Sequence, residues 1–339
     1  MKLIVQIPCF NEAETLAATI SEIPRNIVGI SGVEILVIDD GSTDDTAAVA
    51  LSSGADHLVR HAGNRGLAAA FRSGIDAGLR LGADIIVNTD ADGQYRGSDI
   101  PHLAKPIVDG TADMVIGDRG VASVQHFSRR KRMLQVFGNW VVRRFSGLPL
   151  SDAVTGFRAF SRDAALRLNV VSDFSYTIET IIQAANKKLR VVSINIETNP
   201  DTRESRLFKS LSQFIYMSAK TLLRMYIMYS PLRAFFYVSF ALMIIGAFPI
   251  VRFVYFFLAG DGGGHIQSLI IGALFITIGM VSFLMGVLGD LINFNRKLLE
   301  QILERTKRIE FDTARLSEAE VEADRHETPA EGRAKSRAI

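Results

Sequence analysis

Two long apolar segments near the C-terminus constrain most strongly how this chain of 339 residues can fold. Residues 234–258 carry a single charge, Arg252, and residues 266–289 carry none. At 1.5 Å per helical residue each segment would extend roughly 36 Å, which is enough to cross a bilayer core of about 30 Å with some tilt. The sequence therefore predicts a hairpin of two transmembrane helices within residues 233–290.

The charges around these two segments predict their orientation. Arg233 precedes the first segment, and Arg296 and Lys297 follow the second, whereas the loop of residues 259–265 contains neither Lys nor Arg. By the positive-inside rule the flanks are cytoplasmic and the loop lies outside. We therefore expect a protein of the cell (inner) membrane with two spans, whose N-terminal domain and both termini are cytoplasmic.

The segments on either side of the hairpin have distinct compositions. Residues 207–232 combine basic residues with many aromatics and methionines, which predicts an amphipathic helix in the membrane interface. Residues 291–316 are predicted to form a cytosolic helix whose apolar side packs against another copy or against its own domain. Residues 317–339 are polar and lack aromatic residues, so we expect a disordered tail.

Residues 1–206 alternate between short apolar runs and segments with helical patterns. This alternation, with short connections, is typical of an α/β domain in which helices cover both faces of an open, mostly parallel sheet. Ligands bind such sheets at the carboxyl ends of the strands. The balance of 38 basic and 36 acidic residues indicates no nucleic-acid partner. The single cysteine, Cys9, excludes an internal disulfide framework.

An acidic pair follows the apolar run at residues 85–87. Asp90 and Asp92 are separated by one residue, and the carboxamide of Gln94 comes two positions later. Mg²⁺ and Mn²⁺ bind through one or two carboxylates and share the phosphate oxygens of a substrate, so this pattern predicts a cation site for a nucleotide diphosphate. An Asp-x-Asp tripeptide also occurs in solvated turns. The cation interpretation is favoured because Glu12, Asp39 and Asp40 are expected at the same edge of the sheet.

A helix is predicted over residues 125–147. It contains a basic cluster at residues 129–132, and Arg143 and Arg144 follow later in the same helix. Such a cluster is typical of a site for an anion or a membrane surface. A solvated helix face is the alternative interpretation.

Six short motifs occur in a fixed order along the chain. They are Pro8-Cys9-Phe10-Asn11-Glu12, Asp39-Asp40-Gly41-Ser42-Thr43-Asp44, Asp90-Ala91-Asp92-Gly93-Gln94, Gly117-Asp118-Arg119, Asp152-Ala153-Val154-Thr155-Gly156-Phe157-Arg158 and Arg203-Glu204-Ser205-Arg206. In this order they resemble glycosyltransferase family 2, which has the GT-A fold. The chain is most similar to the polyprenyl-phosphate glycosyltransferases, such as dolichyl-phosphate mannose synthases and bacterial bactoprenol glucosyltransferases. The resemblance covers residues 1 to about 230 motif by motif, and the two-span region matches in arrangement only.

The resemblance implies roles for residues in the first half of the chain. Asp90, Asp92 and Gln94 would be the ligands of Mg²⁺ or Mn²⁺. The residues that would bind the nucleotide sugar are Pro8, Phe10, Glu12, Ile38, Asp40, Asp90, Ala91, Asp92, Gln94, Arg203 and Arg206. Phe10 stands where the family usually has Tyr, Gly93 replaces an apolar residue, and Tyr95 replaces a usual His.

The resemblance also implies an acceptor site and a reaction. Arg119 would meet the acceptor phosphate, and Asp92, Asp152 and Arg119 would be catalytic; the basic cluster, with Arg130, Lys131 and Arg132, is predicted from its charge to dock the same phosphate. The implied reaction is the metal-dependent, inverting transfer of a hexose from a UDP- or GDP-linked sugar to undecaprenyl or dolichyl phosphate. The implied assembly is a homo-oligomer, such as a tetramer, in the lipid bilayer.

Alternatives follow from the same motifs. A glycosyltransferase that uses an unphosphorylated lipid alcohol, such as diacylglycerol, would need a general base, for which Asp152 or Glu179 would serve. A membrane-anchored protein that binds a nucleotide sugar without turnover is the non-catalytic alternative. A processive polysaccharide synthase is disfavoured because the sequence has no Gln-x-x-Arg-Trp motif around its single tryptophan, Trp140. The motifs leave the sugar, the base and the polyprenol length open.

Overall fold

The structure, a computed structural model, describes residues 1–120, 129–171, 176–199, 211–260 and 263–327, in places for the backbone alone. The chain divides into two compact units. Unit 1 contains residues 1–217 together with residues 303–339, and unit 2 contains residues 218–302. This division differs from the predicted boundary between residues 206 and 207, because the last part of the chain joins the N-terminal domain.

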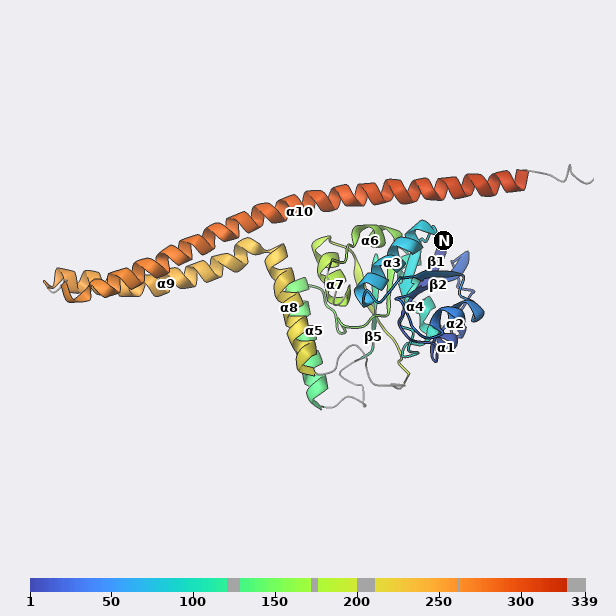
Figure 1. The fold of residues 1–339 in the computed structure, drawn as a ribbon, viewed down its shortest axis with the longest axis horizontal. Helices are drawn as coiled ribbons and strands as arrows, with labels where there is room; N and C mark the ends of the chain where they lie inside the picture. Colours follow the sequence, from blue (N-terminus) through green and yellow to red (C-terminus); the bar gives the residue numbers. More distant parts are fainter. Residues whose placement is uncertain (121–128, 172–175, 200–210, 261–262, 328–339) are drawn as a thin grey trace, which may run out of the picture. The chain divides into compact units, whose positions relative to one another are not determined.

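Unit 1 is built on a seven-stranded sheet (Figure 1). The strand order is β3-β2-β1-β4-β6-β5-β7. The strands are β1 (Lys2–Cys9), β2 (Gly32–Asp39), β3 (His57–Arg60), β4 (Ile85–Asn88), β5 (Met114–Asp118), β6 (Arg158–Ser161) and β7 (Val191–Asn195). Strand β6 runs antiparallel to both β4 and β5, and the other pairs are parallel. The predicted mostly parallel α/β sheet is therefore confirmed.

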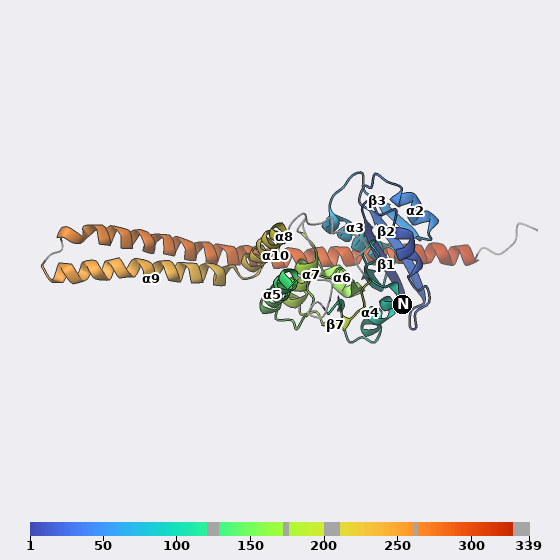
Figure 2. The same cartoon turned by 90° about the horizontal axis from the view of Figure 1, so that it is seen from below.

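Helices cover both faces of this sheet (Figure 2). They are α1 (Leu16–Ser21), α2 (Thr46–Ser52), α3 (Leu67–Arg80), η1 (Gly97–Asp99), α4 (Ile100–Val108), α5 (Arg129–Ser146), α6 (Arg162–Arg167) and α7 (Tyr176–Asn186). Strand β1 is buried on both sides. Leu3, Val5 and Ile7 belong to the same core cluster as residues of α1 and α4. Residues of α3 instead approach Ile4 and Gln6, so alternate β1 residues face opposite helical layers.

The strand register brings the functional motifs to one edge of the sheet. Strands β1 and β2 are paired along their whole length, and β4 pairs with β1 in parallel from Leu3↔Ile85 onward. Because parallel strands end at the same edge, the residues after β1, β2 and β4 meet there. Strand β6 begins at this edge because it is antiparallel, and its first residue, Arg158, lies opposite Asn88 and Ile116.

Unit 2 contains the apolar helices. Helix α8 (Leu211–Tyr229) enters it, and α9 (Pro231–Leu258), η2 (Gly263–His265) and α10 (Ile266–Glu327) follow. Two helical segments, Pro231–Leu258 and Gly263–Phe311, are long and apolar enough to span a membrane, which agrees with the two predicted spans.

Glycines lie where helices α9 and α10 touch. A Cβ on Gly246 would lie 2.8 Å from the carbonyl oxygen of Gly272, and a Cβ on Gly279 would lie 3.1 Å from that of Ser239. Such close backbone approach is the usual way in which helices associate in lipid, where packing rather than hydrophobicity drives contact.

Helix α10 is longer than the sequence predicts. It continues to Glu327, past the predicted helix end at residue 316, so the predicted disordered tail does not begin at residue 317. Six of the eleven residues 317–327 are Glu or Ala, which have high helix propensity, so this segment can form a helix without aromatic residues. Residues 328–339 of the predicted tail lie outside the described part of the chain.

Candidate active site

Acidic side chains gather at the carboxyl edge of the sheet. Burial raises the pKa of the Cys9 thiol well above its ordinary value, and the negative charges of Glu12, Asp39 and Asp90 raise it further. Asp39 ends β2, and Glu12 and Asp90 come just after β1 and β4, so the parallel pairing of these strands brings the three acids to one edge. The expected gathering of carboxylates at one edge is therefore present.

Asp90 and Asp92 lie in the loop of residues 89–95 after β4, which we call the metal loop. Burial, followed by the charge of Asp92, raises the pKa of Asp90 to about 7. The Asp92 Oδ1 atom accepts a hydrogen bond of 3.0 Å from the Gln94 backbone N–H. Two carboxylates that repel each other in a partly buried site form a favourable environment for a divalent cation.

The described residues contain no group of three or more His, Cys, Asp or Glu side chains arranged to hold a metal ion. A cation at the metal loop would therefore take protein oxygens from Asp90, Asp92 and Gln94 and leave positions open. This donor set fits Mg²⁺ or Mn²⁺, which commonly bind through one or two carboxylates together with substrate phosphates.

Asn199, just after β7, holds the backbone of the metal loop. Its N–H donates to the Gln94 carbonyl oxygen at 2.9 Å, and its Nδ2 donates to the Gly93 carbonyl oxygen at 2.9 Å. Its Oδ1 accepts from Arg96 Nε at 3.2 Å. Sequence reasoning missed this residue, because its contacts are about a hundred residues away in the chain.

Asp39 and Asp40, at the end of β2, are both engaged by the protein. Asp39 pairs with Arg60 at 3.0 Å. Asp40 lies 2.6 Å from His61 Nδ1, and it accepts from the backbone N–H groups of Arg65 and Gly66 at 2.9 and 2.8 Å. Asp40 therefore shapes the loop of residues 61–66, and its role in reading a base stays a prediction.

The remaining predicted nucleotide-binding residues of β1 and β2 differ in accessibility. Phe10 is 38% exposed, which leaves its ring available to a ligand. Pro8 and Ile38 are buried within paired strands, so their side chains belong to the core. Glu12 begins the turn before α1, where its backbone N–H donates to Thr46 Oγ1 at 2.9 Å. Ala91 is buried in the metal loop.

Arg119 and Asp152 form a bidentate ion pair. Arg119 Nε donates to Asp152 Oδ2 at 2.6 Å, and Nη2 donates to Oδ1 at 3.1 Å. The Asp152 side chain is fully buried, and that of Arg119 is 12% exposed. The sequence predicted both residues at the site but not their pairing, which fixes the orientation of each.

Arg158 is the buried residue that organises the loop containing Asp152. Its guanidinium donates to the carbonyl oxygens of Ala153, Thr155 and Thr177 and to Thr180 Oγ1, at 2.7 to 2.9 Å. Burial lowers the pKa of Arg158 to about 10. The sequence signal for this role is an arginine that begins a strand and is followed by Ala159 and Phe160.

Gly156 connects the Asp152 loop to the metal loop. A Cβ at this position would lie 3.0 Å from Asp90 Oδ1 and 2.8 Å from the Tyr176 hydroxyl, so the two loops meet where only hydrogen fits. The Tyr95 hydroxyl accepts from the Gly156 N–H at 3.2 Å, and burial raises the pKa of Tyr95 to about 12. Tyr95, which stands in place of a usual His, therefore also joins the loops.

Several predicted residues cannot be placed at the site. Arg203 and Arg206 lie outside the described residues. Arg130, Lys131 and Arg132 begin helix α5, but only the backbone of that segment is described. Glu179 is fully buried in α7 and accepts from the Val171 backbone N–H at 3.0 Å, so it supports the chain there.

Comparison with known sequences identifies related proteins. The family model described as glycosyl transferase family 2 matches residues 4–168. An uncharacterized glycosyltransferase of Mycobacterium tuberculosis is 34% identical over 58% of this chain and 85% of its own length. The undecaprenyl-phosphate mannosyltransferase of Micrococcus luteus is 30% identical, over 58% of this chain and 83% of its own. The polyprenol monophosphomannose synthase of Mycolicibacterium smegmatis is 31% identical, over 58% and 76%.

A solved structure matches the fold. Glucosyl-3-phosphoglycerate synthase from Mycobacterium tuberculosis, crystallised with Mn²⁺, uridine diphosphate and glucosyl-3-phosphoglycerate, aligns with a TM-score of 0.51. The alignment covers 67% of this chain and 78% of that one, at 21% identity. At this identity the similarity establishes the common architecture, which is the GT-A arrangement.

Proposed function

This chain belongs to glycosyl transferase family 2 and is a glycosyltransferase; from that premise we propose that it transfers a hexose from a nucleotide sugar to a polyprenyl phosphate. The proposal includes a UDP- or GDP-linked donor, a divalent cation and inversion at the anomeric carbon. The reaction would take place at the cytoplasmic face of the membrane. One observation carries the proposal: Gly156, four residues after Asp152, packs against Asp90 of the metal loop, and Asp152 itself pairs with Arg119.

The lipid acceptor is supported by the relatives and by the apolar helices. Two similar proteins are named for transfer to undecaprenyl phosphate and for polyprenol monophosphomannose synthesis. The two candidate spans would hold such an enzyme at the membrane, where a polyprenyl phosphate resides. Positive charges flank the hairpin but are absent from its loop, which supports cytoplasmic termini.

The donor site is supported by the chemistry of the metal loop. Asp90, Asp92 and Gln94 offer oxygen ligands, and Phe10, just after β1, offers an exposed ring at the same edge of the sheet. A bound Mg²⁺ or Mn²⁺ would neutralise the charge that develops on the departing diphosphate. The structurally similar synthase was crystallised with Mn²⁺ and uridine diphosphate, which agrees with this choice.

We infer a single in-line displacement. An oxygen of the acceptor phosphate attacks C1 of the sugar as the bond from C1 to the diphosphate oxygen breaks. A phosphate monoester has a second pKa near 6 and is largely dianionic at pH 7, so the attack needs no strong base. Asp152, which is held by Arg119, would orient the acceptor, and Arg119 would provide positive charge beside it.

Further parts of the proposal rest on sequence patterns. Arg130, Lys131 and Arg132 would dock the lipid phosphate, and Arg203 and Arg206 would bind the donor phosphates. Residues 207–232 would lie in the membrane interface. The cytosolic helix that follows the hairpin would support a homo-oligomer such as a tetramer.

Two measurements test this function on the full-length protein in lipid nanodiscs. A panel of UDP- and GDP-sugars is added with and without Mn²⁺, and the true donor should raise the melting temperature only when metal is present. The selected donor, radiolabelled, is then incubated with polyprenyl phosphate or diacylglycerol. A label in a mild-acid-labile lipid product made only from polyprenyl phosphate supports the proposal, whereas a product from diacylglycerol overturns it. Donor binding without any product would indicate the non-catalytic alternative.

A further inference from the structure

The part of α10 that belongs to unit 1 presents one helical face to the catalytic domain. Glu304, Lys307, Arg308 and Phe311 follow the spacing i, i+3, i+4 and i+7, so they lie on the same side of the helix. Phe311 is only 2% exposed. On other sides of the helix, Ile309 is 70% exposed and Arg305 is also exposed.

Two residues of α3 contact this segment. Lys307 Nζ lies 3.2 Å from Asp76 Oδ1. Arg80 Nη2 donates to Glu310 Oε1 at 3.0 Å, and its guanidinium carbon lies 5.9 Å from the centre of the Phe311 ring. Each helix therefore contributes one acidic and one basic side chain to the two ion pairs, and the buried Phe311 ring lies near Arg80.

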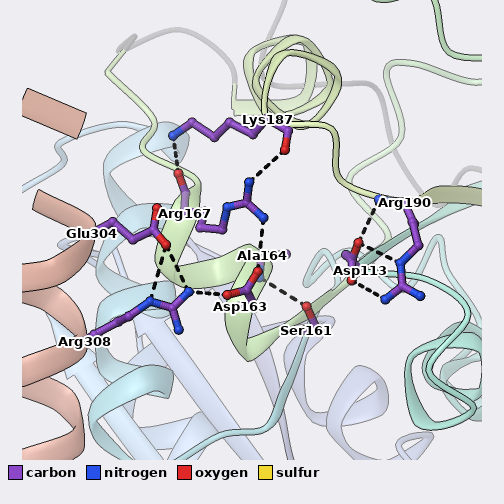
Figure 3. Close-up of polar contacts among 9 residues, drawn as sticks. All are labelled: Asp113, Ser161, Asp163, Ala164, Arg167, Lys187, Arg190, Glu304 and Arg308. Atoms are coloured by element: carbon purple, nitrogen blue, oxygen red, sulfur yellow. Dashed lines mark hydrogen bonds and ion pairs between the residues drawn. The ribbon is translucent and has the colours of Figure 1, made fainter. Parts of the chain in front are cut away.

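Helix α6 provides the third anchor (Figure 3). Arg308 donates to Asp163, and it is held in place by Glu304, whose Oε1 accepts at 3.0 Å. Asp163 also pairs with Arg167 at 3.2 Å, and Arg167 donates to the Lys187 carbonyl oxygen at 2.7 Å. The docked arginine thus joins a polar network that continues from α6 to the end of α7.

Single exposed ion pairs contribute little to stability and are screened by salt. Here three pairs with matched signs accompany one buried ring along the same segment, so a one-residue shift of the helix would mismatch all of them. The combination of matched ion pairs with a buried ring is typical of a specific docking surface and not of incidental surface contacts.

We propose that Asp76, Arg80 and Asp163 form a docking surface for residues 304–311 of the same chain, and that this docking assists use of the lipid acceptor. The docked segment continues the helix that contains the second candidate span. Docking would therefore limit the positions open to the catalytic domain at the membrane and raise its effective concentration near a membrane-bound acceptor. This second part rests on the proposed function, whereas the docking itself does not.

Cross-linking tests the docking independently of activity. The variant Asp76→Cys/Lys307→Cys in nanodiscs is treated with a short bismaleimide, and the matched control is Asp76→Cys/Arg305→Cys, whose second cysteine lies on an exposed side of the helix. The native Cys9 is buried and should not react. We expect an internal cross-link in the first variant, at least fivefold less in the control, and a yield that falls at 1 M salt. A cross-linked dimer, or equal yields in both variants, would overturn docking within one chain.

Charge exchange tests the contribution to acceptor use. The variant Lys307→Glu/Arg308→Glu should raise KM for polyprenyl phosphate severalfold and leave KM for the nucleotide sugar unchanged. Adding Asp76→Lys/Asp163→Lys should restore the lower value, because opposite charges face each other again. Arg305→Glu is the control for net charge. Unchanged acceptor KM in Lys307→Glu/Arg308→Glu would refute the functional part, while the cross-link in Asp76→Cys/Lys307→Cys would still support the docking. If no variant or wild type transfers sugar, the proposed function fails instead.

Discussion

The carboxylates of the metal loop and of the loop that contains Asp152 have opposite electrostatic environments. In the metal loop, Asp90 lies beside Asp92, and burial together with the like charge raises the pKa of Asp90 to about 7. In the Asp152 loop, the fully buried carboxylate is matched by both donors of Arg119. The carboxylates of the metal loop would therefore be stabilised by an added cation. The Asp152 carboxylate is already neutralised by the guanidinium of Arg119.

This difference suggests a division of labour in the proposed reaction. The donor diphosphate is negatively charged, and this charge must be neutralised. The donor would bind at the metal loop together with a metal ion, which provides the neutralising charge. The acceptor loop has to hold its shape when the substrate is absent, which a bidentate ion pair and the buried Arg158 achieve.

The largest expected effect is on the Asp152 side. Arg119→Met leaves the buried Asp152 without its counter-charge and should lower stability by about 3–5 kcal/mol. Thermal unfolding of the purified protein measures this loss. Arg119→Met/Asp152→Asn should recover part of it, because the uncompensated charge is then gone. An unchanged melting temperature for the single variant would show that the pair does not support the loop.

Removing a carboxylate from the metal loop should affect turnover instead. Asp92→Asn is expected to reduce transfer to polyprenyl phosphate about 100- to 1000-fold, because the charge on the departing diphosphate is no longer neutralised. The radiolabelled lipid product measures the rate. Asp109→Asn, a surface change at the end of α4, serves as the control. Near-normal transfer by Asp92→Asn with metal present would contradict the assignment of this loop.

The junction between the loops should be sensitive to a single methyl group. In Gly156→Ala the new Cβ would lie 3.0 Å from Asp90 Oδ1 and 2.8 Å from the Tyr176 hydroxyl, so the loops must move apart. We expect a loss of about 1–3 kcal/mol in stability. Mn²⁺ affinity should also weaken, which titration calorimetry can measure. Gly110→Ala is a useful comparison, because a Cβ there meets no atom within 4 Å although its backbone φ is +69°. Equal Mn²⁺ affinity in Gly156→Ala and wild type would argue against contact between the loops.

The smallest expected effect is a gain in stability that depends on pH. Because the pKa of Asp90 is raised to about 7 in the folded protein, its charge destabilises the metal-free fold as pH rises from about 4 through 7. Asp90→Asn should therefore raise the melting temperature by a few degrees above pH 7, roughly 2–4 °C per kcal/mol, and not at pH 4. Saturating Mn²⁺ should reverse the order at pH 8, since it stabilises only the wild type. A gain that is independent of pH would point to a cause other than the charge of Asp90.

Much of the site could be predicted because its residues follow strands directly. The motifs at Asp39, Asp90 and Glu12 come at strand ends, and parallel strands bring such ends together without further information. The two candidate spans likewise follow from length and apolar composition alone. Sequence reasoning missed Asn199 and His61, since each is a single polar residue whose partners become visible only in the folded chain.

By itself, the sequence determined the mostly parallel α/β domain, the acids at its carboxyl edge and the apolar hairpin, because each depends on local patterns of burial and charge. Only the tertiary structure decided that β6 runs antiparallel, that Arg119 pairs with Asp152, and that Arg308 meets Asp163. The two residues of the last pair are 145 positions apart. A contact over that separation depends on the path of the whole chain, and no local pattern of side chains specifies it.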